Sequence, residues 1–305
     1  MDPTIEKVAL AAEAKVRALR RAPLGYFILS ALAGIYVGFG IVLIFAIGAP
    51  LAAAGSPLTK ALMGASFGVA LSLVIFAGSE LFTGNNLFLT VGVLTGRSRI
   101  SELAALWGWC FAGNLAGSLL LAWLVVQSGA LSADPQQSFV LRTVATKMTL
   151  PFWPLVVRGI LCNWLVCLAV WMAQRAQSET ARLVLIFWYL FAFIGAGFEH
   201  SVANMTLLGI GLFLPHEAPI GWAGFAWNLS AVTLGNVIGG AGFVATLYWL
   251  SSPVRRFAGA GAQPDAVAPA MARAVPAAAP GARWSYPSGA PLNEARPSGA
   301  PQPAS

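Results

Sequence analysis

Long apolar runs without charged residues dominate the sequence up to about residue 253. Six of these runs contain no Asp, Glu, Lys or Arg, and they span residues 22–59, 61–79, 103–133, 159–174, 183–198 and 218–254. A membrane-crossing α-helix needs about 20 apolar residues, and each run supplies all or most of them. The pattern predicts six membrane-spanning helices.

Two of these spans contain the same polar interruption. Residues 77–85 read AGSELFTGN and residues 196–204 read AGFEHSVAN, so Ala-Gly-x-Glu stands five residues ahead of Asn in both. A carboxylate is costly in hydrocarbon, while Gly and Asn favour helix ends. We therefore predict that the second and fifth spans are broken helices that face each other, an arrangement typical of transport pathways.

A second motif repeats at a similar distance. Gly-Asn-x-x-Gly occurs at residues 113–117 and again at residues 235–239, about 120 residues later. Two units of three spans enter a membrane from opposite sides, because three is an odd number. The sequence predicts an all-α membrane protein with six transmembrane helices in two inverted three-helix repeats, at about residues 23–128 and 150–253. The paired glycines indicate close packing of the third helix in each unit.

The two ends of the chain differ from this apolar region, residues 23–253. Apolar residues recur at helical spacing among charges within residues 1–22, which predicts an amphipathic cytoplasmic helix. Two positions stay open for this helix: on the membrane surface, or against neighbouring subunits. The mixed charges ahead of the first span argue against a cleaved signal peptide. Residues 254–305 are rich in Pro and Ala, and we expect a disordered cytoplasmic tail there.

Charge assigns an orientation to the spans. The net charge is +7, and 14 of the 18 Lys and Arg residues lie at the two ends or in the 2–3 and 4–5 connections. By the positive-inside rule, both termini are cytoplasmic. Membrane orientation accounts for the positive charge, so we expect the lipid bilayer and no nucleic acid as a partner.

Residues suited to metal, cofactor or catalytic chemistry are few in this sequence. Cys110, Cys162 and Cys167 fall within predicted spans, without the spacing of a zinc or iron–sulfur site. His200 is the only histidine within a span, which argues against a bis-histidine haem. We therefore expect neither an enzyme nor a resident cofactor or metal.

The interruptions bring polar groups into the membrane interior. Glu80 and Glu199 can accept hydrogen bonds from backbone N–H groups that the breaks free, or they can handle protons or ions directly. Asn85 and Asn204 can cap the half-helices that follow. The positive N-terminal ends of these half-helices favour an anion.

One histidine distinguishes the second interruption from the first. His200 directly follows the glutamate, whereas Leu81 holds the equivalent place in the first unit. This asymmetry favours a function for His200, and Thr83 can present a hydroxyl to the same centre. Asn114 is expected to hold helices together, while packing and pore lining both remain open for Asn236. Small anions are the expected cargo.

Four segments carry motifs in a fixed order: residues 78–92 (GSELFTGNNLFLTVG), 162–172 (CNWLVCLAVWM), 197–205 (GFEHSVANM) and 232–240 (VTLGNVIGG). Together they resemble the formate/nitrite transporter family. The resemblance covers residues 5–252 and implies an aquaporin-like protomer with its own pore. It also implies a homopentamer in the bacterial cytoplasmic (inner) membrane that conducts small monovalent anions of weak acids. Thr83-Gly84 and Trp164 are similar to the nitrite branch, so nitrite is the expected substrate.

Other functions stay open beside nitrite transport. Formate or hydrosulfide fits the same chemistry, and a neutral solute such as water or ammonia fits the same shape. A non-transporting membrane anchor for an enzyme complex is the alternative from another class.

The resemblance also implies roles for polar residues. Thr83 and His200 match the central polar pair of the pore, and Asn163 and Asn236 match amides that line the pathway. Lys147 matches a lysine of the outer vestibule, whose charge would attract anions.

Apolar residues are implied to close the pore on both sides of that pair. Phe67, Leu71 and Phe193 match the periplasm-side constriction. Leu81 and Val166 match the cytoplasm-side constriction. A histidine with an ordinary pKa near ~6.5 could stabilise an anion between them as imidazolium, or could protonate it.

Overall fold

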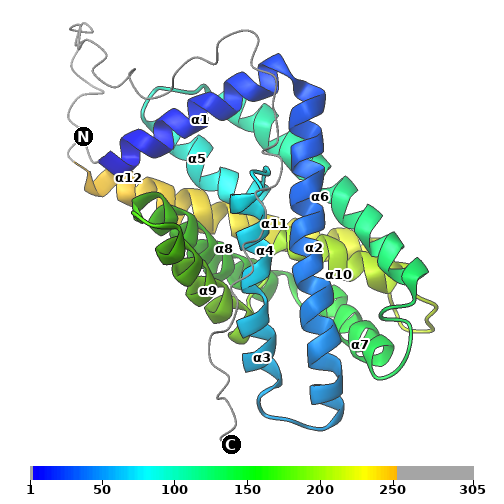
Figure 1. Ribbon diagram of the computed structural model, residues 1–305. Helices are drawn as coiled ribbons and strands as arrows, with labels where there is room; N and C mark the ends of the chain where they lie inside the picture. Colours follow the sequence, from blue (N-terminus) through cyan, green and yellow to red (C-terminus); the bar gives the residue numbers. More distant parts are fainter. Residues whose placement is uncertain (1–2, 253–305) are drawn as a thin grey trace, which may run out of the picture. The chain divides into compact units, whose positions relative to one another are not determined.

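Helices make up almost all of residues 3–252, the part of the chain that the computed structural model describes (Figure 1). They are α1 (Pro3–Arg21), α2 (Pro23–Ala53), α3 (Thr59–Ser66), α4 (Gly68–Phe76), α5 (Phe82–Leu94), α6 (Ile100–Ser128), α7 (Gln136–Thr149), α8 (Phe152–Arg175), α9 (Glu179–Gly195), α10 (Ser201–Phe213), α11 (Trp222–Val237), the π-helix η1 (Ile238–Thr246) and α12 (Leu247–Ser251). The all-α class predicted from the apolar runs is confirmed. The tail predicted over residues 254–305 lies outside the described residues.

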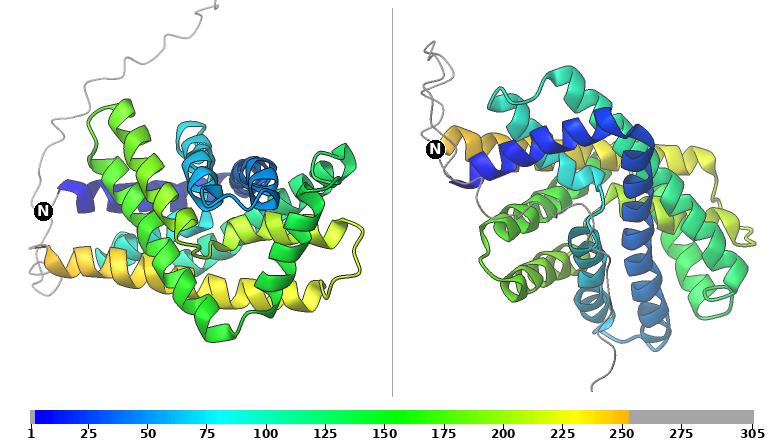
Figure 2. Two further views of the ribbon diagram at one scale, coloured as in Figure 1. Left: turned by 90° about the horizontal axis from the view of Figure 1, so that it is seen from below. Right: turned by 45° about the horizontal axis from the view of Figure 1, so that its top comes forward.

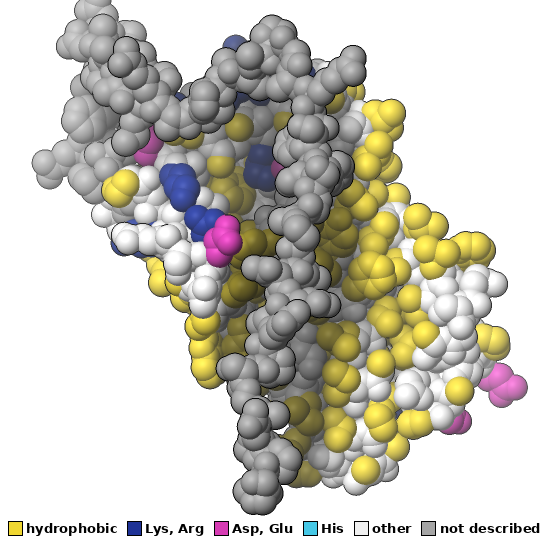
Figure 3. Space-filling view, viewed as in Figure 1, with side chains coloured by type: hydrophobic (Ala, Val, Ile, Leu, Met, Phe, Trp, Pro, Cys, Tyr) yellow, Lys and Arg dark blue, Asp and Glu magenta, His cyan; other side chains and the backbone are white. Residues whose placement is uncertain are grey.

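Long apolar helices account for most of the predicted spans. Within residues 3–252, five helical segments are long and apolar enough to cross a membrane: Pro23–Ala53, Thr59–Phe76, Ile100–Ser128, Phe152–Arg175 and Trp222–Ser251. The fifth predicted span corresponds to α9, which is shorter at 17 residues. Hydrophobic side chains cover much of the described surface in Figure 3. This surface suits contact with lipid or with other subunits.

The chain leaves helical structure at both polar interruptions. α4 ends at Phe76 and α5 begins at Phe82. In the second unit, α9 ends at Gly195 and α10 begins at Ser201. Each interruption therefore separates a long helical segment from a helix of 13 residues.

Glycine allows the turn at each interruption. Gly78 and Gly197 hold the same place in the two motifs, and their φ angles are +73° and +74°. A side chain is strained in this left-handed region, whereas glycine adopts it readily. The half-helices start three residues ahead of Asn85 and Asn204, so the prediction that these asparagines cap them is wrong.

Close packing joins the first and third long helices of each unit. A Cβ on Gly117 of α6 would lie 1.9 Å from the carbonyl oxygen of Ala31 in α2. A Cβ on Gly235 of α11 would lie 2.2 Å from the carbonyl oxygen of Val156 in α8. The close approach predicted from the repeated Gly-Asn-x-x-Gly motif is confirmed, because only glycine leaves room for the neighbouring backbone.

The predicted N-terminal helix is present as α1, but its apolar face has a different partner from those expected. Ile5, Val8, Ala12 and Val16 are buried within the chain itself. Ala12 lies against Gly92 of α5, and α1 lies beside α5 in Figures 1 and 2. Both predicted positions, on the lipid surface and against another subunit, are therefore wrong for this face.

One amphipathic helix was not predicted from the sequence. α7 lies in the connection between α6 and α8, for which no helix was predicted. Its buried residues are Val140, Val144 and Met148, spaced four apart along one face. In Figure 1, α7 lies near the lower end of the described region and α1 near the upper end.

Candidate functional site

A buried hydroxyl–imidazole pair joins the two interruptions. Thr83 lies in the first turn of α5, and His200 is the residue directly before α10. Thr83 Oγ1 and His200 Nε2 are 3.0 Å apart, and both side chains are buried. The fold thus brings together two residues 117 positions apart in the chain. These are the two residues predicted to form a central polar pair.

The second ring nitrogen of His200 fixes the direction of this hydrogen bond. The backbone N–H of Ala203 donates to Nδ1 at 3.1 Å, so His200 caps the start of α10. Because Nδ1 is an acceptor here, the neutral ring carries its proton on Nε2 and donates it to Thr83 Oγ1. The Thr83 hydroxyl proton is then directed to a different acceptor.

The carboxylate of Glu80 is the centre of a polar cluster at the first interruption. Lys15 of α1 donates to its two oxygens at 2.7 and 2.6 Å. Tyr26 Oη and Asn85 Nδ2 donate to Oε2 at 3.0 and 3.1 Å. The lysine neutralises a carboxylate that would otherwise be costly in an apolar region.

Glu199 has a matching set of partners at the second interruption. Lys147 of α7 donates to its Oε2 at 2.6 Å, and Asn204 Nδ2 donates to the same oxygen at 2.7 Å. Asn204 Nδ2 also contacts Asn228 Oδ1 at 2.8 Å. Lys147 is therefore the counterpart of Lys15. The repeat extends into α7 and α1, ahead of the predicted starts near residues 150 and 23.

The backbone of the first interruption is held by an asparagine and not by the glutamate as predicted. Asn114 Oδ1 accepts the N–H of Phe82 at 2.9 Å. Its Nδ2 donates to the carbonyl oxygens of Glu80 at 2.9 Å and Ser30 at 2.7 Å. The role expected for Asn114 in holding helices together agrees with these contacts. Of the two roles left open for Glu80, backbone hydrogen bonding is wrong, and direct proton or ion handling stays a prediction.

Asn236 repeats this arrangement at the second interruption. Its Oδ1 accepts the N–H of Ser201 at 2.8 Å, and its Nδ2 donates to the carbonyl oxygens of Glu199 and Gly159 at 2.9 and 2.8 Å. The side chain is fully buried. All its polar groups bind backbone, which supports the packing alternative; pore lining stays a prediction.

Asn163 links Thr83 of the Thr83–His200 pair to the sixth span, close to its π-helical part. Its Nδ2 lies 2.7 Å from the carbonyl oxygen of Asn236, 3.0 Å from Asn86 Oδ1 and 3.3 Å from the carbonyl oxygen of Thr83. Asn236 stands just ahead of η1, where a change of helical register leaves a carbonyl for another partner. The contacts of Asn163 position Thr83, and its predicted role in lining a pore is not tested by them.

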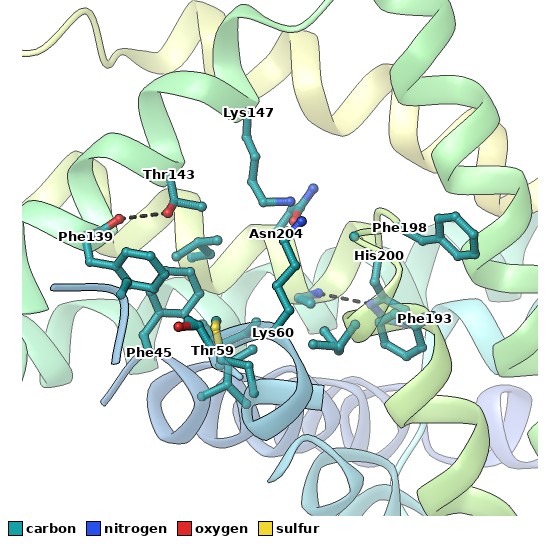
Figure 4. Close-up of a pocket in the computed structure, with 18 of the residues that line it drawn as sticks. Phe45, Thr59, Lys60, Phe139, Thr143, Lys147, Phe193, Phe198, His200 and Asn204 are labelled. Carbon is teal, nitrogen blue, oxygen red and sulfur yellow. Dashed lines mark hydrogen bonds between the residues drawn. The ribbon is translucent and has the colours of Figure 1, made fainter. Parts of the chain in front are cut away.

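Two separate cavities approach this centre. The first, the Lys147 cavity, has a volume of about 510 Å³ and reaches Lys147, Phe193 and His200 (Figure 4). The second, the Lys15 cavity, has a volume of about 480 Å³ and reaches Lys15 and Leu81. Within residues 3–252, no residue lines both. Each cavity therefore contains one of the two lysines that bind a glutamate.

The two units run between these cavities in opposite directions. Lys60, near the start of α3, lines the Lys147 cavity, and Ile75, near the end of α4, lines the Lys15 cavity. Along α9 the order is reversed, from Arg182 at the Lys15 cavity to Phe193 at the Lys147 cavity. Inverted repeats require this reversal.

Two phenylalanine rings pack beside His200, where the Lys147 cavity reaches it. Phe67 and Phe193 meet edge to face with ring centroids 5.6 Å apart, and Phe193 stacks on His200 at 6.0 Å. Both phenylalanines are almost fully buried. Their position beside His200 is compatible with the outer constriction implied by the family resemblance.

The other predicted constriction residues lie differently. Leu71 was assigned to the same constriction as Phe67, but it lines the Lys15 cavity together with Leu81. Its place in the outer constriction stays a prediction. Val166 is buried and lines neither cavity, and its role stays a prediction.

Three residues of the site were missed in the sequence. Lys15 was counted only as a cytoplasmic charge, and Tyr26 and Asn228 were not considered. Asn228 is an amide inside an apolar run, as Asn114 is, and this signal could have identified it. The pairing of Lys15 could have been suggested only by knowing that Lys147 occupies the matching place in the second unit.

Comparisons with known proteins agree with this architecture. A family model described as formate/nitrite transporter matches residues 2–250. Nitrite transporter NirC of Escherichia coli (strain K12) is 44% identical over 250 residues, which are 82% of this chain and 92% of that protein.

Two solved structures are similar along most of the chain. A structure described as an FNT family ion channel has a TM-score of 0.79 and 44% identity, covering 83% of this chain and 100% of that one. A pentameric formate channel with formate bound has a TM-score of 0.67 and 31% identity, covering 76% of this chain and 98% of that one.

Proposed function

Because this chain belongs to the formate/nitrite transporter family, we propose that it carries small monovalent anions of weak acids across a membrane. Nitrite is the first candidate, since a relative named as a nitrite transporter is 44% identical. Formate is the second candidate, since a solved relative is described as a formate channel with formate bound.

The Thr83–His200 pair is the observation that most strongly supports this proposal. It stands where α5 and α10 begin, and the partial positive charge of helix N-termini favours an anion. It also lies among apolar rings, where an anion loses hydration at a cost of several kcal/mol. Hydrogen-bond donors at this point offset part of that cost.

The direction of the hydrogen bond suggests how the pair acts. His200 donates Nε2–H to Thr83 Oγ1, which leaves the Thr83 hydroxyl proton for the passing anion. In this state the pair stabilises an anion without giving up a proton. Proton transfer from His200 requires a protonated ring, and placing that proton on Nδ1 first breaks the bond from the Ala203 N–H.

A lysine side chain lies on the path of the anion on each side of the Thr83–His200 pair. Lys147 and Lys15 each lie in a cavity that opens toward one of the interruptions. Each lysine is paired with a glutamate, so it offers an arriving anion an N–H donor and not a net positive charge. We propose that Lys147 acts on one side of the membrane and Lys15 on the other.

The test is nitrite flux through full-length protein in proteoliposomes. Thr83→Val removes the hydroxyl at nearly constant size, and we expect a loss of about tenfold or more. Thr83→Ser is the matched control, because it keeps the hydroxyl and should keep most of the flux. Wild-type flux in Thr83→Val would overturn the role assigned to the pair.

The role of His200 is tested in the same vesicles by a pH series. If His200 transfers a proton, flux changes between about pH 5 and 8 and His200→Gln flattens that change, whereas a pair that acts only by hydrogen bonding gives the same pH profile in both proteins. An unchanged profile in the variant would remove proton handling from the mechanism. It would leave hydrogen bonding by Thr83 in place.

Flux measurements with different solutes decide which anion is preferred and whether the protein is an anion transporter at all. Nitrite and formate are measured separately on the same preparation, and we expect nitrite to be the faster. A membrane anchor for an enzyme complex would give no anion flux, and a water or ammonia channel would give flux that ignores Lys147→Met.

Assembly and orientation belong to the same proposal. We propose a homopentamer, since a solved relative is described as pentameric. We also propose a bacterial inner-membrane location with both termini in the cytoplasm, so that the Lys147 cavity faces outward. Labelling of intact cells with a thiol reagent that does not cross the membrane tests this orientation. Lys60→Cys should react from outside, and Lys7→Cys should not.

A further inference from the structure

The Lys147 cavity is larger than the proposed substrates need. Its volume of about 510 Å³ exceeds that of a three-atom anion many times over, since one water occupies about 30 Å³ in the liquid. It falls within the range of sites that hold drug-sized ligands, roughly 300–1,000 Å³. The cavity therefore has room for a second class of ligand.

One wall of this cavity is apolar and aromatic. Phe45 of α2 and Phe139 of α7 pack with ring centroids 5.3 Å apart, and Ile41, Ile44 and Met63 extend the surface. In Figure 4 the two rings lie together, away from Phe193 and His200. A flat apolar group fits against such a wall with favourable burial.

The other groups that line the cavity give it a positive charge. Lys147 is balanced by Glu199, but within residues 3–252 Lys60 has no carboxylate partner within 4.0 Å. In the same described region, no Asp or Glu lines the cavity. Arg142, placed 5.8 Å from the centroid of the Phe139 ring, adds a further positive charge nearby.

We propose that the Lys147 cavity binds organic monoanions that carry an apolar ring or tail. The anionic head lies near Lys60, and the ring lies against Phe45 and Phe139. Such a ligand is too bulky to pass between Phe67 and Phe193, so it occludes the cavity and competes with small anions from that side. Only this competition rests on the proposed transport function; binding itself does not.

Benzenesulfonate is the probe for this site, because it has a ring and a permanent negative charge. Its binding to the detergent-solubilised full-length protein is measured by calorimetry at low salt. We expect one site per protomer. Methanesulfonate has the same head without the ring, and benzyl alcohol has the ring without the charge. Each should bind at least about tenfold more weakly, since it lacks one of the two contacts.

Lysine variants locate the head group. Lys60→Gln should weaken benzenesulfonate binding about two- to fivefold, the size expected of an exposed ion pair. Lys7→Gln is the matched control, because Lys7 lines the Lys15 cavity, and it should leave benzenesulfonate binding unchanged. Added salt should narrow the difference between wild type and Lys60→Gln.

The ring contact is tested by Phe139→Leu, a change that keeps an apolar residue. It should weaken benzenesulfonate binding and leave methanesulfonate binding as it was. Equal binding of benzenesulfonate and methanesulfonate would overturn the proposal. So would equal effects of Lys60→Gln and Lys7→Gln.

Flux measurements separate this inference from the transport proposal. Benzenesulfonate added to proteoliposomes should inhibit nitrite flux only where the Lys147 cavity faces the added compound. Binding without any nitrite flux would refute the transport function alone. Nitrite flux without benzenesulfonate binding would refute the ligand site alone.

Discussion

Removing the charge of Lys147 gives the sharpest test of how the interruptions are held. Lys147 and Glu199 are 2.6 Å apart, and the Glu199 side chain is only 3% exposed. At an effective dielectric constant of about 20, their Coulomb attraction is about 6 kcal/mol. The cost of removing both charges from water cancels much of this attraction, so the net value of the pair is far smaller.

The variant Lys147→Met loses more than that net value. It leaves Glu199 buried with Asn204 as its remaining donor among the described residues. Breaking a buried pair in this way costs about 3–5 kcal/mol, and the 18% exposure of Lys147 places the expected loss near the lower end, at about 3 kcal/mol. At about 2–4 °C per kcal/mol, the unfolding midpoint should fall by about 6–12 °C.

Two further variants control this measurement. Arg17→Met breaks the exposed pair with Glu13, whose side chains are 51% and 38% exposed, and should cost no more than about 0.5 kcal/mol. Lys147→Met combined with Glu199→Gln removes the stranded charge and keeps an acceptor for Asn204. It should recover most of the loss, because no unpaired buried charge remains.

The assay is thermal unfolding of the full-length protein in detergent, followed by tryptophan fluorescence. The reasoning is refuted if Lys147→Met shifts the midpoint no more than Arg17→Met does. It is also refuted if the double variant is as unstable as Lys147→Met, because the loss would then come from packing and not from an unpaired carboxylate.

Four other substitutions, one of them a control, can be judged by the same unfolding assay. Gly240→Ala places a Cβ 2.6 Å from the side-chain amide nitrogen of Asn163 and should cost about 1–3 kcal/mol of unfolding free energy. Its control is Gly242→Ala, whose Cβ would have no atom within 4 Å and should not lower the midpoint. Equal midpoints for the two variants would contradict this expectation. Gly197→Ala meets no neighbour but forces alanine into φ +74°, so a loss of about 1–2 kcal/mol is expected, and no loss would show that the turn relaxes. Asn114→Ala leaves backbone groups of the first interruption without partners and should cost about 1–3 kcal/mol, while a neutral result would mean that water replaces the amide.

Local features explain why several parts of the fold could be predicted. The position of each turn could be predicted because Gly78 and Gly197 stand in a repeated motif. Only glycine readily adopts the required positive φ angle. The close approach at Gly117 and Gly235 was readable for the same reason. These properties depend on a few neighbouring residues.

Contacts between distant segments could not be predicted with the same accuracy. The starts of α5 and α10 were placed too late, because Asn85 and Asn204 look like caps but bind glutamate side chains instead.

The sequence by itself determined that apolar helices cross a membrane and that two of them are interrupted, since both properties follow from run length, glycine and buried charge. Only the tertiary structure decided which charges meet. Lys15 reaches Glu80 across 65 positions, Lys147 reaches Glu199 across 52, and Thr83 reaches His200 across 117. No local pattern encodes such pairings, because they depend on how the packed helices place their ends in space.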